Sequence, residues 1–394
     1  MKILVVCQYY YPEPFRINDI CEEMVRRGHE VTVVTGEPNY PEGEIYRGYE
    51  NHEKSDEVIN GVRVHRCPII PRKEGTIHRL LNYFSYPFQA KRYVKNLKAS
   101  DGRPFDVVFV NQLSPVMMAE PAIAYKKKYG TPIVMYCLDL WPESLVAGGI
   151  VRGSFFYRFF YSVSKRIYRS MDRILLTSRM FSKYFEDEFG VKNTEYLPQY
   201  AEEIFEPLPY KEPGETIDFV FAGNIGTAQS VDTIIRAAEK LQNRKVHFQI
   251  VGSGVELERL KSIAGENVTF YGRRPLEEMP QFYAMADAML VTLQADSVLS
   301  YTLPGKVQSY MAAGKPIIGA IDGETKEVIR EAKCGYCGPA EDAEELVRNI
   351  CRFLDYENKS QMGLNARKYY EEFFSRNVFM EQIENELKTV GIIR

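Results

Sequence analysis

The sequence has no long hydrophobic run. Its 394 residues contain no stretch of about 18 uncharged apolar residues, the length that a membrane-crossing helix requires. The chain opens with MKILVVCQYY, an apolar but short run that no basic segment precedes, unlike a secretory leader. We therefore expect a cytoplasmic protein without a signal peptide or a transmembrane span.

Closely spaced cysteines are also scarce, which argues against the common metal and disulfide frameworks. The seven cysteines are scattered and odd in number, and only Cys334 and Cys337 lie close together. A zinc site needs a second pair or nearby histidines, and this pair has neither. We expect reduced cysteines that pack in the core, with a redox or metal role for Cys334 and Cys337 as the alternative.

Acidic residues are few in one part of the chain. Overall, 45% of the residues are hydrophobic and 26% are charged, and the length exceeds what one hydrophobic core usually supports. Residues 60–170 contain 18 Lys and Arg against six acids, an excess of 12, although the whole chain has a formal net charge of −3. Such a basic region attracts anionic partners, and the candidates are phospholipid, polyprenyl phosphate and nucleic acid.

Strand and helix patterns alternate along two stretches of the chain. Short apolar runs are expected as strands at 2–7, 30–35, 62–67, 106–110, 132–137 and 173–177, then at 217–221, 246–251, 268–271, 288–292 and 316–320. Helical patterns between them imply parallel sheets that are covered on both faces. The fold class is therefore α/β, with two doubly wound, Rossmann-like domains whose ligands bind beyond the carboxyl ends of the strands.

A proline-rich segment divides the two stretches. Residues 198–214 contain four prolines and few apolar runs, which is typical of a linker. We expect a first domain at 1–197, a linker at 198–214, a second domain at 215–372, and a C-terminal helix at 373–394 that packs back on the first domain.

The strand that opens the second expected domain runs into a glycine-containing loop. Gly223 and Gly226 flank Asn224 in the sequence FVFAGNIGT, and a helix follows Thr227. Glycine lets the backbone approach a phosphate, and a helix N-terminus offers N–H donors. The loop predicts a phosphate site, and a tight turn without a ligand is the alternative.

A second segment of this kind starts at Gly305. Gly305 and Lys306 open an expected helix that ends at Gly314. A cation in the first helical turn opposes the helix dipole, and a bound diphosphate would offset this. The alternative is a solvated lysine, but two such loops in one domain favour a nucleotide more than either does alone.

Five motifs occur in order along the chain: Arg27–Thr35 (RGHEVTVVT), Asp139–Ser144 (DLWPES), Phe221–Gly226 (FAGNIG), Tyr283–Asp287 (YAMAD) and Pro304–Ile317. Together they resemble the motifs of family 4 glycosyltransferases with the GT-B fold, and in particular the enzymes of bacterial capsule, O-antigen and exopolysaccharide assembly. The resemblance implies an N-terminal acceptor domain that faces a C-terminal sugar-nucleotide domain across a cleft. It also implies transfer with retained anomeric configuration, without a metal or a cofactor.

The resemblance assigns donor-binding residues to the second domain. The residues that would contact the donor diphosphate are Gly223, Asn224, Gly226, Thr227, Gly305 and Lys306. Arg273 and Arg274 would lie near the base and the phosphates, where an arginine can clamp a phosphate with two hydrogen bonds. Salt bridges from these arginines to Glu277 or Glu278 are the alternative.

The sequence departs from the family pattern at the donor site. Two glutamates that normally hold the donor sugar and the ribose are replaced by Tyr301 and Ser309, and an Arg-Lys pair is replaced by polar residues such as Thr227 and Gln229. This departure leaves the donor open. We expect Lys306 to supply the missing positive charge and to act as a catalytic residue, and Ser309 to remain in the donor site.

The segment Asp139–Ser144 follows an expected strand of the first domain, at the end where ligands of parallel sheets bind. Asp139 and Glu143 are candidate catalytic residues that accept hydrogen bonds from sugar hydroxyls or help to deprotonate the acceptor. Trp141 offers an apolar face to a pyranose ring or a lipid. Alternatively, Asp139 or Ser144 caps a helix and Trp141 fills the core.

The first strand-to-helix loop carries Arg16 and Asn18 toward the same end of the sheet. Both are candidate contacts to the acceptor or to the donor phosphates. The alternative is a rigid, proline-braced loop with Arg16 in solvent.

The excess positive charge is concentrated in Arg79–Lys98 and Arg152–Arg169, where it is mixed with Phe, Tyr and Leu. This composition is typical of helices that lie in a membrane interface, and two ordinary helices with one buried aromatic stripe are the alternative. We expect contact with the inner face of the cell membrane. Nucleic acid is not expected, because no known binding module is present.

The predicted function is that of a retaining glycosyltransferase of surface polysaccharide synthesis. The donor would be a sugar nucleotide, by family default a UDP-sugar and by our hypothesis an N-acetylhexosamine, and the acceptor a glycan linked to polyprenyl diphosphate. A sugar-nucleotide 2-epimerase of the same fold and a non-catalytic partner of another transferase are the alternatives. The sequence leaves the oligomeric state open.

Overall fold

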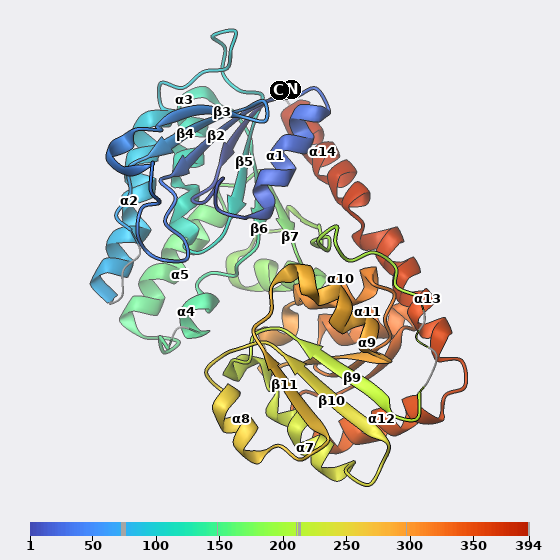
Figure 1. The fold of residues 1–394 in the computed structure, drawn as a ribbon. Coiled ribbons are helices and arrows are strands. Elements are labelled where there is room, and N and C mark those ends of the chain that lie inside the picture. The colour runs from blue at the N-terminus through green and yellow to red at the C-terminus, as the bar shows by residue number, and fades with distance from the viewer. Residues whose placement is uncertain (72–75, 148, 210, 212–213, 297, 393–394) are drawn as a thin grey trace. The chain divides into compact units, whose positions relative to one another are not determined.

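The computed structural model describes residues 1–71, 76–147, 149–209, 211, 214–296 and 298–392. Over these residues the chain forms two compact units (Figure 1). Unit 1 comprises Met1–Thr177, Ser182–Leu197 and Met380–Arg394, and unit 2 comprises Ser178–Phe181 and Pro198–Phe379.

The boundaries of the units differ in detail from the expected domains. The described part of the expected linker belongs to unit 2, where Lys211 forms ion pairs of 2.6 Å with Asp218 and 3.0 Å with Asp287. Residues 210, 212 and 213 of that segment lie outside the described residues. The C-terminal segment belongs to unit 1 from Met380 onward, seven residues later than expected. There, Glu384 accepts a hydrogen bond of 2.9 Å from Arg27 and is paired with His29 at 2.9 Å.

Within the described residues, unit 1 is built on an eight-stranded sheet of order β3-β4-β2-β1-β5-β6-β7-β8. All neighbouring strands are parallel except β3 and β4. Most of the parallel strands are almost completely buried, which explains their continuous apolar sequences. The strands are β1 (Lys2–Val6), β2 (Glu30–Gly36), β3 (Asp56–Ile59), β4 (Val62–Cys67), β5 (Val107–Gln112), β6 (Ile133–Cys137), β7 (Arg173–Leu176) and β8 (Thr194–Tyr196).

The helices of unit 1 follow from apolar spacing and capping. Helix α1 buries Ile17, Ile20, Cys21 and Met24, which lie on one face of a helix, and its chain reverses at Gly28 with a φ of 84°. Helix α5 starts at Ser154, whose hydroxyl accepts a hydrogen bond of 3.3 Å from the Tyr157 amide. The helices are α1 (Arg16–Arg26), α2 (Thr76–Val94), α3 (Glu120–Tyr129), α4 (Glu143–Ala147) and α5 (Phe155–Tyr168), while α6 (Arg179–Tyr184) and α14 (Arg376–Ile392) each begin in unit 2 and end in unit 1.

Unit 2 contains, within the described residues, a six-stranded sheet of order β11-β10-β9-β12-β13-β14, and every neighbouring pair is parallel. Its strands are β9 (Ile217–Ala222), β10 (Val246–Val251), β11 (Val268–Gly272), β12 (Ala288–Thr292), β13 (Ile317–Ala320) and β14 (Gly335–Gly338). Its helices are α7 (Asp232–Lys240), α8 (Leu257–Ile263), α9 (Met279–Met285), α10 (Gly305–Ala312), α11 (Glu324–Ala332), α12 (Ala343–Asp355) and α13 (Lys359–Tyr369).

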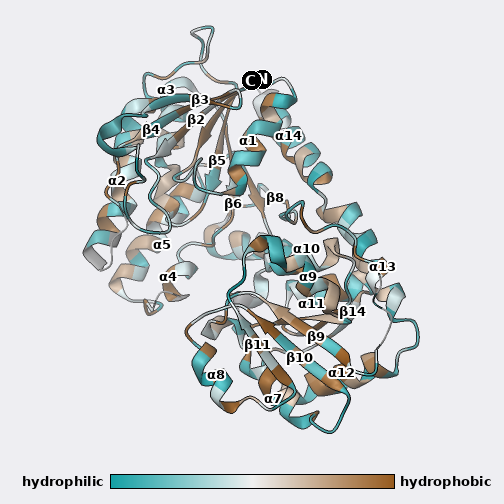
Figure 2. Ribbon diagram, in the orientation of Figure 1, coloured by the Kyte–Doolittle hydropathy of each residue, from teal (hydrophilic) through white to brown (hydrophobic). Residues whose placement is uncertain are grey.

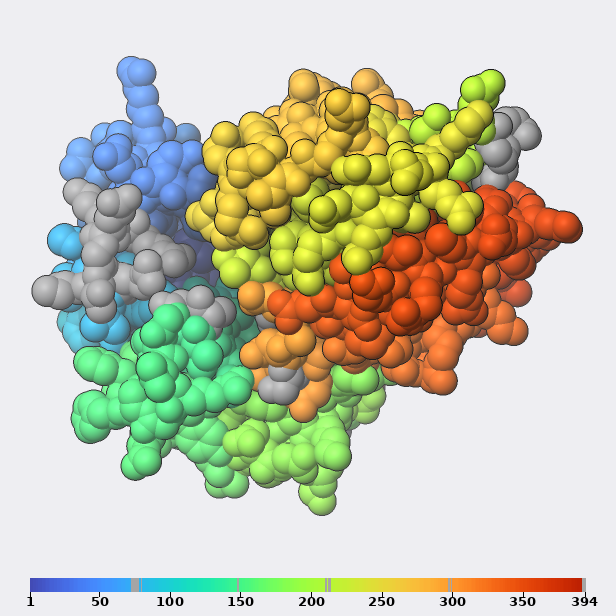
Figure 3. Space-filling model, turned by 90° about the horizontal axis from the view of Figure 1, so that it is seen from below, coloured from blue at the N-terminus to red at the C-terminus, as the bar shows by residue number. Residues whose placement is uncertain are grey.

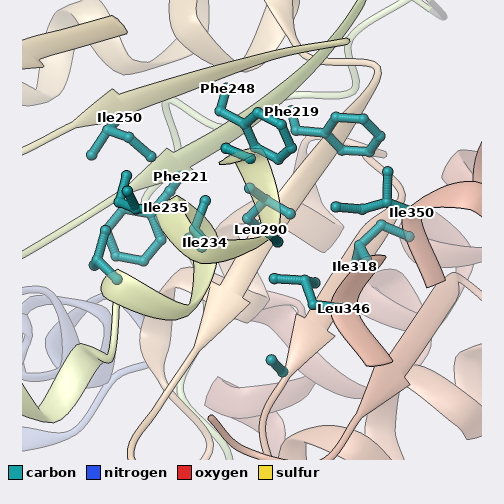
Figure 4. Packing of buried hydrophobic residues seen from close by; sticks show 14 of the residues in the cluster. Phe219, Phe221, Ile234, Ile235, Phe248, Ile250, Leu290, Ile318, Leu346 and Ile350 are labelled. Carbon is teal, nitrogen blue, oxygen red and sulfur yellow. The ribbon is translucent and has the colours of Figure 1, made fainter. Parts of the chain in front are cut away.

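The core of unit 2 fills the space between this sheet and the helices α7 and α12 (Figure 4). Phe219 of β9 stacks on Phe248 of β10 at 5.6 Å and meets Phe353 of α12 edge-on. The facing helices contribute aliphatic residues such as Ile234 and Ile350, both fully buried. This packing fixes the strands rigidly, so the loops at their carboxyl ends start from defined positions.

The doubly wound α/β fold is therefore confirmed in both units. In each sheet the first strand of the unit lies in the interior, and the strands that follow are added first on one side and then on the other. The strand order changes direction between β1 and β5 in unit 1 and between β9 and β12 in unit 2. No helix among the described residues is long and apolar enough to cross a membrane.

Candidate functional site

The change of direction in unit 2 creates the first candidate site. Helical connections leave β9 and β12 toward opposite faces of the sheet, which opens a crevice at the carboxyl ends of these strands. The loop that contains Gly223, Asn224 and Gly226 follows β9 and leads into a short 3-10 helix from Thr227 to Gln229. The Gln294 amide after β12 donates a hydrogen bond of 3.0 Å to the carbonyl of Ala228, so the two strand ends hold one loop.

Glycines make this loop compact. The Ile225 amide donates a hydrogen bond of 2.8 Å to the Ser253 carbonyl, so the loop after β9 packs directly on the loop after β10. A Cβ atom at Gly252 would overlap the carbonyl oxygen of Gly223, and one at Gly254 would overlap that of Ile225. Only glycine fits at these two positions. The result is a strip of backbone without side chains, to which a ligand phosphate can come close.

Lys306 lies beside this strip. Its ammonium group donates a hydrogen bond of 2.6 Å to the Gln229 side chain and lies 3.9 Å from the centre of the Phe221 ring. A Cβ atom at Gly223 would come 2.7 Å from the Lys306 nitrogen, which shows how closely this lysine approaches the loop. The side chain is partly exposed as a whole, but its ammonium end is enclosed. This burial lowers the pKa of Lys306 to about 7.

An anion in the crevice would reverse that shift. Among the described residues, Lys306 forms no ion pair with a carboxylate, and its ammonium contacts only neutral groups, the Gln229 side chain and the Phe221 ring. A diphosphate placed next to the ammonium would stabilise its charged form, so Lys306 would take up a proton when the diphosphate binds. The arrangement therefore suits a ligand with negative charge.

Helix α10 carries Lys306 and is anchored to β9. The Tyr310 hydroxyl accepts a hydrogen bond of 3.1 Å from the Ala222 amide and donates one of 3.1 Å to the Ala222 carbonyl. Gly305, the first residue of the helix, is exposed and has open space where a side chain would be. Its N-terminus therefore reaches the crevice as a backbone surface, next to the loop after β9.

The structure places a carboxylate near Ser309 that the sequence did not reveal. The Ser309 hydroxyl lies one turn beyond Gly305, and it contacts the Gly305 carbonyl at 3.3 Å and the Glu202 carboxylate at 3.4 Å. Glu202 lies in the segment that we expected to be a linker, and no local signal marks it. The other altered position, Tyr301, ends a short 3-10 helix before α10. The roles of Ser309 and Tyr301 stay predictions.

The remaining donor-site candidates are exposed. Asn224 and Thr227 face solvent, and the Thr227 hydroxyl is 3.4 Å from the Glu256 carboxylate. Arg274 donates a hydrogen bond of 3.1 Å to the Tyr271 carbonyl and lies 3.7 Å from Glu278, as in the salt-bridge alternative. Arg273 is exposed next to it. The phosphate-clamp role of both arginines stays a prediction.

The second candidate site is the same edge of the sheet in unit 1, where Asp139 follows β6. Both carboxylate oxygens of Asp139 accept hydrogen bonds from hydroxyls, one from Ser114 after β5 and one from Ser144 of α4. The Trp141 ring nitrogen donates a hydrogen bond of 2.7 Å to Ser114. The Gln112 side-chain NH2 group donates one of 3.0 Å to the Asp139 backbone carbonyl. Asp139 is thus held in one orientation and remains partly exposed.

The prediction that Trp141 offers a face to a sugar or a lipid is wrong. Its side chain is only 1% exposed. Tyr83 of α2 meets the ring at 5.7 Å and Phe160 of α5 meets it at 5.6 Å, both edge-on. Trp141 is therefore a packing residue that joins the Asp139 loop to two helices. The sequence did not show which side of this loop faces inward.

Glu143 is enclosed by partners. One carboxylate oxygen accepts hydrogen bonds from the hydroxyls of Tyr157 at 2.8 Å and Tyr184 at 2.9 Å, and the other accepts two from the Arg152 guanidinium at 2.6 and 2.9 Å. Burial and this carboxylate raise the pKa of both tyrosines. These contacts favour a role in positioning α4 and α5 rather than the catalytic role that we expected for Glu143.

The loop after β1 contains a further polar group that the sequence analysis missed. Glu13 is completely buried, and burial raises its pKa to about 7 although one of its oxygens accepts hydrogen bonds from the amides of Asn39 at 2.9 Å and Tyr40 at 2.7 Å. The Asn18 side chain donates a hydrogen bond of 2.8 Å to the Glu13 carbonyl, and Arg16 starts α1 next to it. Arg16 and Asn18 are thus at the carboxyl edge of the sheet, and their ligand-binding role stays a prediction.

Comparison with known proteins agrees with this architecture. The model of the glycosyl transferase 4-like domain matches residues 15–198, and the model of the glycosyl transferases group 1 matches residues 216–356. WcaI of Escherichia coli (strain K12), named as a glycosyl transferase of colanic acid biosynthesis, is 24% identical over 98% of this chain and 100% of its own.

Solved structures share the fold over the whole chain. Sucrose-phosphate synthase from Thermosynechococcus elongatus superposes with a TM-score of 0.72 at 16% identity, covering 99% of this chain and 98% of that one. HepE from Anabaena, solved in complex with UDP, superposes with a TM-score of 0.70 at 15% identity, covering 99% and 100%. The motifs, the two sheets and the two family models together show that the chain belongs to the family 4 glycosyltransferases of the GT-B fold.

Proposed function

We propose that this glycosyltransferase moves a sugar, with retention of anomeric configuration, from a UDP-linked donor to a glycan on polyprenyl diphosphate. The sugar would be an N-acetylhexosamine, and the reaction would take place at the inner face of the cell membrane in bacterial surface polysaccharide synthesis. The glycine strip with the enclosed Lys306 ammonium is the observation that carries this proposal. The UDP in the HepE complex and the name of WcaI support the choice of donor and pathway.

In this proposal, unit 2 stabilises the leaving group. Negative charge grows on the diphosphate as the bond to the sugar breaks. Hydrogen-bond donors and cations that are already in place stabilise this charge most. The N-terminus of α10 and the ammonium of Lys306 supply these donors from protein groups alone. We therefore propose that transfer needs neither a metal ion nor a cofactor.

Unit 1 would hold the acceptor. Asp139 has a fixed orientation because two serine hydroxyls donate to it, and it lies partly exposed at the edge of the sheet where ligands bind. A carboxylate in this position can accept a hydrogen bond from the attacking sugar hydroxyl and increase its nucleophilicity. Glu143, Arg152 and the neighbouring tyrosines would keep the loop in place.

The test is a transfer assay with UDP-N-acetylglucosamine and a short-chain polyprenyl-diphosphate sugar, in buffer that contains EDTA. We expect release of UDP together with a lipid product that is larger by one sugar, whose new linkage keeps the donor configuration by NMR. Conversion of the donor to its C2 epimer would show the epimerase instead. UDP binding without either reaction would favour a non-catalytic partner, and no reaction with any nucleotide sugar would overturn the proposal.

A further inference from the structure

A cavity of about 310 Å³ opens in unit 1 between the hairpin of β3 and β4, the strand β2 and the residues at the end of α2. We call it the β3–β4 cavity. Its volume is at the lower end of the range of ligand pockets, about 300–1,000 Å³. Figure 2 shows hydrophilic residues (teal) on the hairpin, and Figure 3 shows the chain around residue 50 (blue) at the surface.

The register of the strands builds one wall of the β3–β4 cavity. Arg63 and His65 of β4 point to the same face of the sheet, because side chains alternate along a strand. Parallel pairing places Thr32 of β2 opposite Arg63. Antiparallel pairing places Val58 of β3 opposite Arg63, and it places Asp56 opposite His65. All five side chains therefore belong to one face, and all five residues line the cavity.

The opposite wall comes from the end of α2. The Tyr93 ring stacks face to face on the His65 imidazole, and Leu97 lines the cavity next to it. Burial raises the pKa of Tyr93 to about 12, so its phenol stays neutral and can both donate and accept a hydrogen bond. The cavity thus combines apolar surface with a few polar groups, which is typical of sites for small organic ligands.

One buried hydroxyl of the cavity wall lacks a partner. Thr32 is 4% exposed, and its hydroxyl oxygen forms no hydrogen bond within the part of the chain that the structure describes. A buried polar group without a partner destabilises a protein, and a ligand group that bonds to it removes this effect. The Thr32 hydroxyl is therefore an independent sign that a polar ligand enters the cavity.

The charges of the wall point to a neutral ligand. Asp56 is paired with His65 at 2.8 Å, and Arg63 is paired with Glu30. The remaining acid of the wall, Glu57, is paired with an arginine of β4. An ionic ligand would have to compete with these pairs. A carboxylate has about four lone-pair sites, so it can accept bonds from ligand hydroxyls while it keeps its cation.

We propose that the β3–β4 cavity binds a neutral saccharide unit, whose ring packs on the apolar surface and whose hydroxyls bond to the polar groups. Thr32 and Arg63 lie near the amino ends of their strands, whereas Asp139 follows the carboxyl end of β6. In addition, β4 lies four strand positions from β6, or about 19 Å at about 4.8 Å per strand. The saccharide in the cavity is therefore not the one that Asp139 activates.

A second saccharide site would hold a growing glycan at two points. The bound unit is then a distal sugar of the acceptor glycan, and its binding raises the local concentration of the acceptor at the transfer site. This assignment of the saccharide to the acceptor rests on the proposed function, while the binding of a saccharide in the cavity does not.

The test is saturation-transfer NMR of the full chain with the methyl glycosides of glucose, galactose, mannose, fucose and N-acetylglucosamine as probes. We expect at least one glycoside to bind with about millimolar affinity and to stay bound when UDP is added. Val58→Trp places a large ring at the exposed rim of the cavity and should weaken binding by about tenfold or more. Val151→Trp, at a position of similar exposure in unit 1, is the matched control and should bind as the wild type does.

Thr32→Val is the second variant. It keeps the shape of the side chain but removes the hydroxyl, so glycoside affinity should fall by about fivefold. The melting temperature of the free protein should not fall, because the hydroxyl has no partner among the described residues. A lower melting temperature with unchanged glycoside affinity would assign Thr32 to the fold alone and contradict its role in binding.

Two results would overturn the inference: no binding of any glycoside to the wild type, or binding that Val58→Trp leaves unchanged. Circular dichroism and the thermal shift with UDP check the folding of each variant. Sugar transfer without glycoside binding would refute the cavity site alone, whereas glycoside binding without sugar transfer would refute the proposed function alone.

The source of the saccharide is tested with two lipid-linked acceptors, one that carries a single sugar and one that carries several. If the acceptor glycan occupies the cavity, Val58→Trp should raise KM about tenfold for the longer acceptor and leave the shorter one unchanged. Equal KM values of Val58→Trp and the wild type for the longer acceptor would contradict this assignment and leave a free saccharide as the ligand.

Discussion

The two sheets share a doubly wound parallel arrangement, but the loops at their carboxyl ends differ in chemistry. In unit 2 the carboxyl edge is nearly bare: Gly223, Gly252 and Gly254 bring backbone against backbone, and the enclosed ammonium of Lys306 lies next to them. In unit 1 the same edge is filled with side chains, among them the buried Trp141 and the carboxylates of Asp139 and Glu143, which accept hydrogen bonds from neighbouring side chains. The fold sets where a ligand binds, while the loops decide which ligand it is.

This difference separates two tasks. A backbone strip with one cation suits a diphosphate, which is recognised by its charge and needs no side chains above it. A carboxylate that is held by hydroxyls suits a neutral sugar hydroxyl, which must be oriented. Changes in unit 2 should therefore act on nucleotide binding and on departure of the diphosphate, and changes in unit 1 on activation of the acceptor or on stability.

The largest effect is expected for Gly252→Ala. The added Cβ would overlap the carbonyl oxygen of Gly223, so the two loops must separate and the phosphate surface is lost. UDP affinity, measured by calorimetry, should fall by more than about 100-fold. Gly214→Ala is the matched control, because its Cβ would make only ordinary contacts at 3.7 Å or more. Wild-type affinity in Gly252→Ala would show that the phosphates bind elsewhere.

The next effect concerns the cation. Lys306→Met keeps an unbranched side chain that is one atom shorter but removes the charge next to the glycine strip, and we expect kcat to fall by about 100-fold. The melting temperature of the free protein should not fall, because burial disfavours the charge of Lys306 and no ion pair of this lysine exists within the described part of the chain. Lys261→Met, which alters an exposed lysine of α8, is the control. Normal turnover in Lys306→Met would refute the assigned role.

Substitutions of Asp139 and Glu143 in unit 1 should differ in effect, the first lowering turnover and the second lowering stability. Asp139→Asn should lower kcat by about 100-fold with little change in stability, since the amide oxygen can still accept from one serine hydroxyl while the amide NH2 group donates to the other. Glu143→Gln weakens charge-assisted bonds to Arg152 and two tyrosines, and we expect a loss of about 1–2 kcal/mol, or roughly 2–8 °C in melting temperature. Calorimetric scans and steady-state kinetics separate the two, and an exchange of these phenotypes would reverse the assignment.

The smallest effect is the pH dependence of UDP binding. Burial lowers the pKa of Lys306 from 10.5 to about 7, and a bound diphosphate favours the charged form. Binding then takes up a proton above pH 7, so affinity should be constant below pH 7 and fall by up to about tenfold per unit above it. Lys306→Met should remove this dependence, and an equal slope in the variant would assign it to another group.

The sequence predicted the buried parallel strands well, because strands that are covered on both faces form continuous apolar runs. β10 and β12 were expected with the bounds that the structure has. β4 was expected with the bounds that it has, but β3 and the hairpin that it forms with β4 were missed, although Asn60-Gly61, with φ values of 49° and 83°, is a typical turn signal. β14 was not predicted, because it begins and ends with glycine, which is not typical of strands. Glycine is needed at Gly335 since a Cβ there would overlap the carbonyl of Ile317.

The candidate sites were predictable only where a local motif marks them. The glycine loop and Lys306 are adjacent in space as expected, because each follows directly from the end of a strand or the start of a helix. Glu13, Ser114 and Glu202 were missed, since their importance depends on partners far along the chain. Burial of Trp141 between two helices is likewise a tertiary property that spacing does not encode.

The division of tasks between the units is tested most directly by titrating UDP into the wild type, Gly252→Ala and Asp139→Asn in one calorimeter at pH 7. We predict that Gly252→Ala loses UDP binding, while Asp139→Asn binds UDP as the wild type does and yet fails to transfer the sugar. Loss of UDP binding in Asp139→Asn together with normal binding in Gly252→Ala would contradict the assignment of the nucleotide to unit 2.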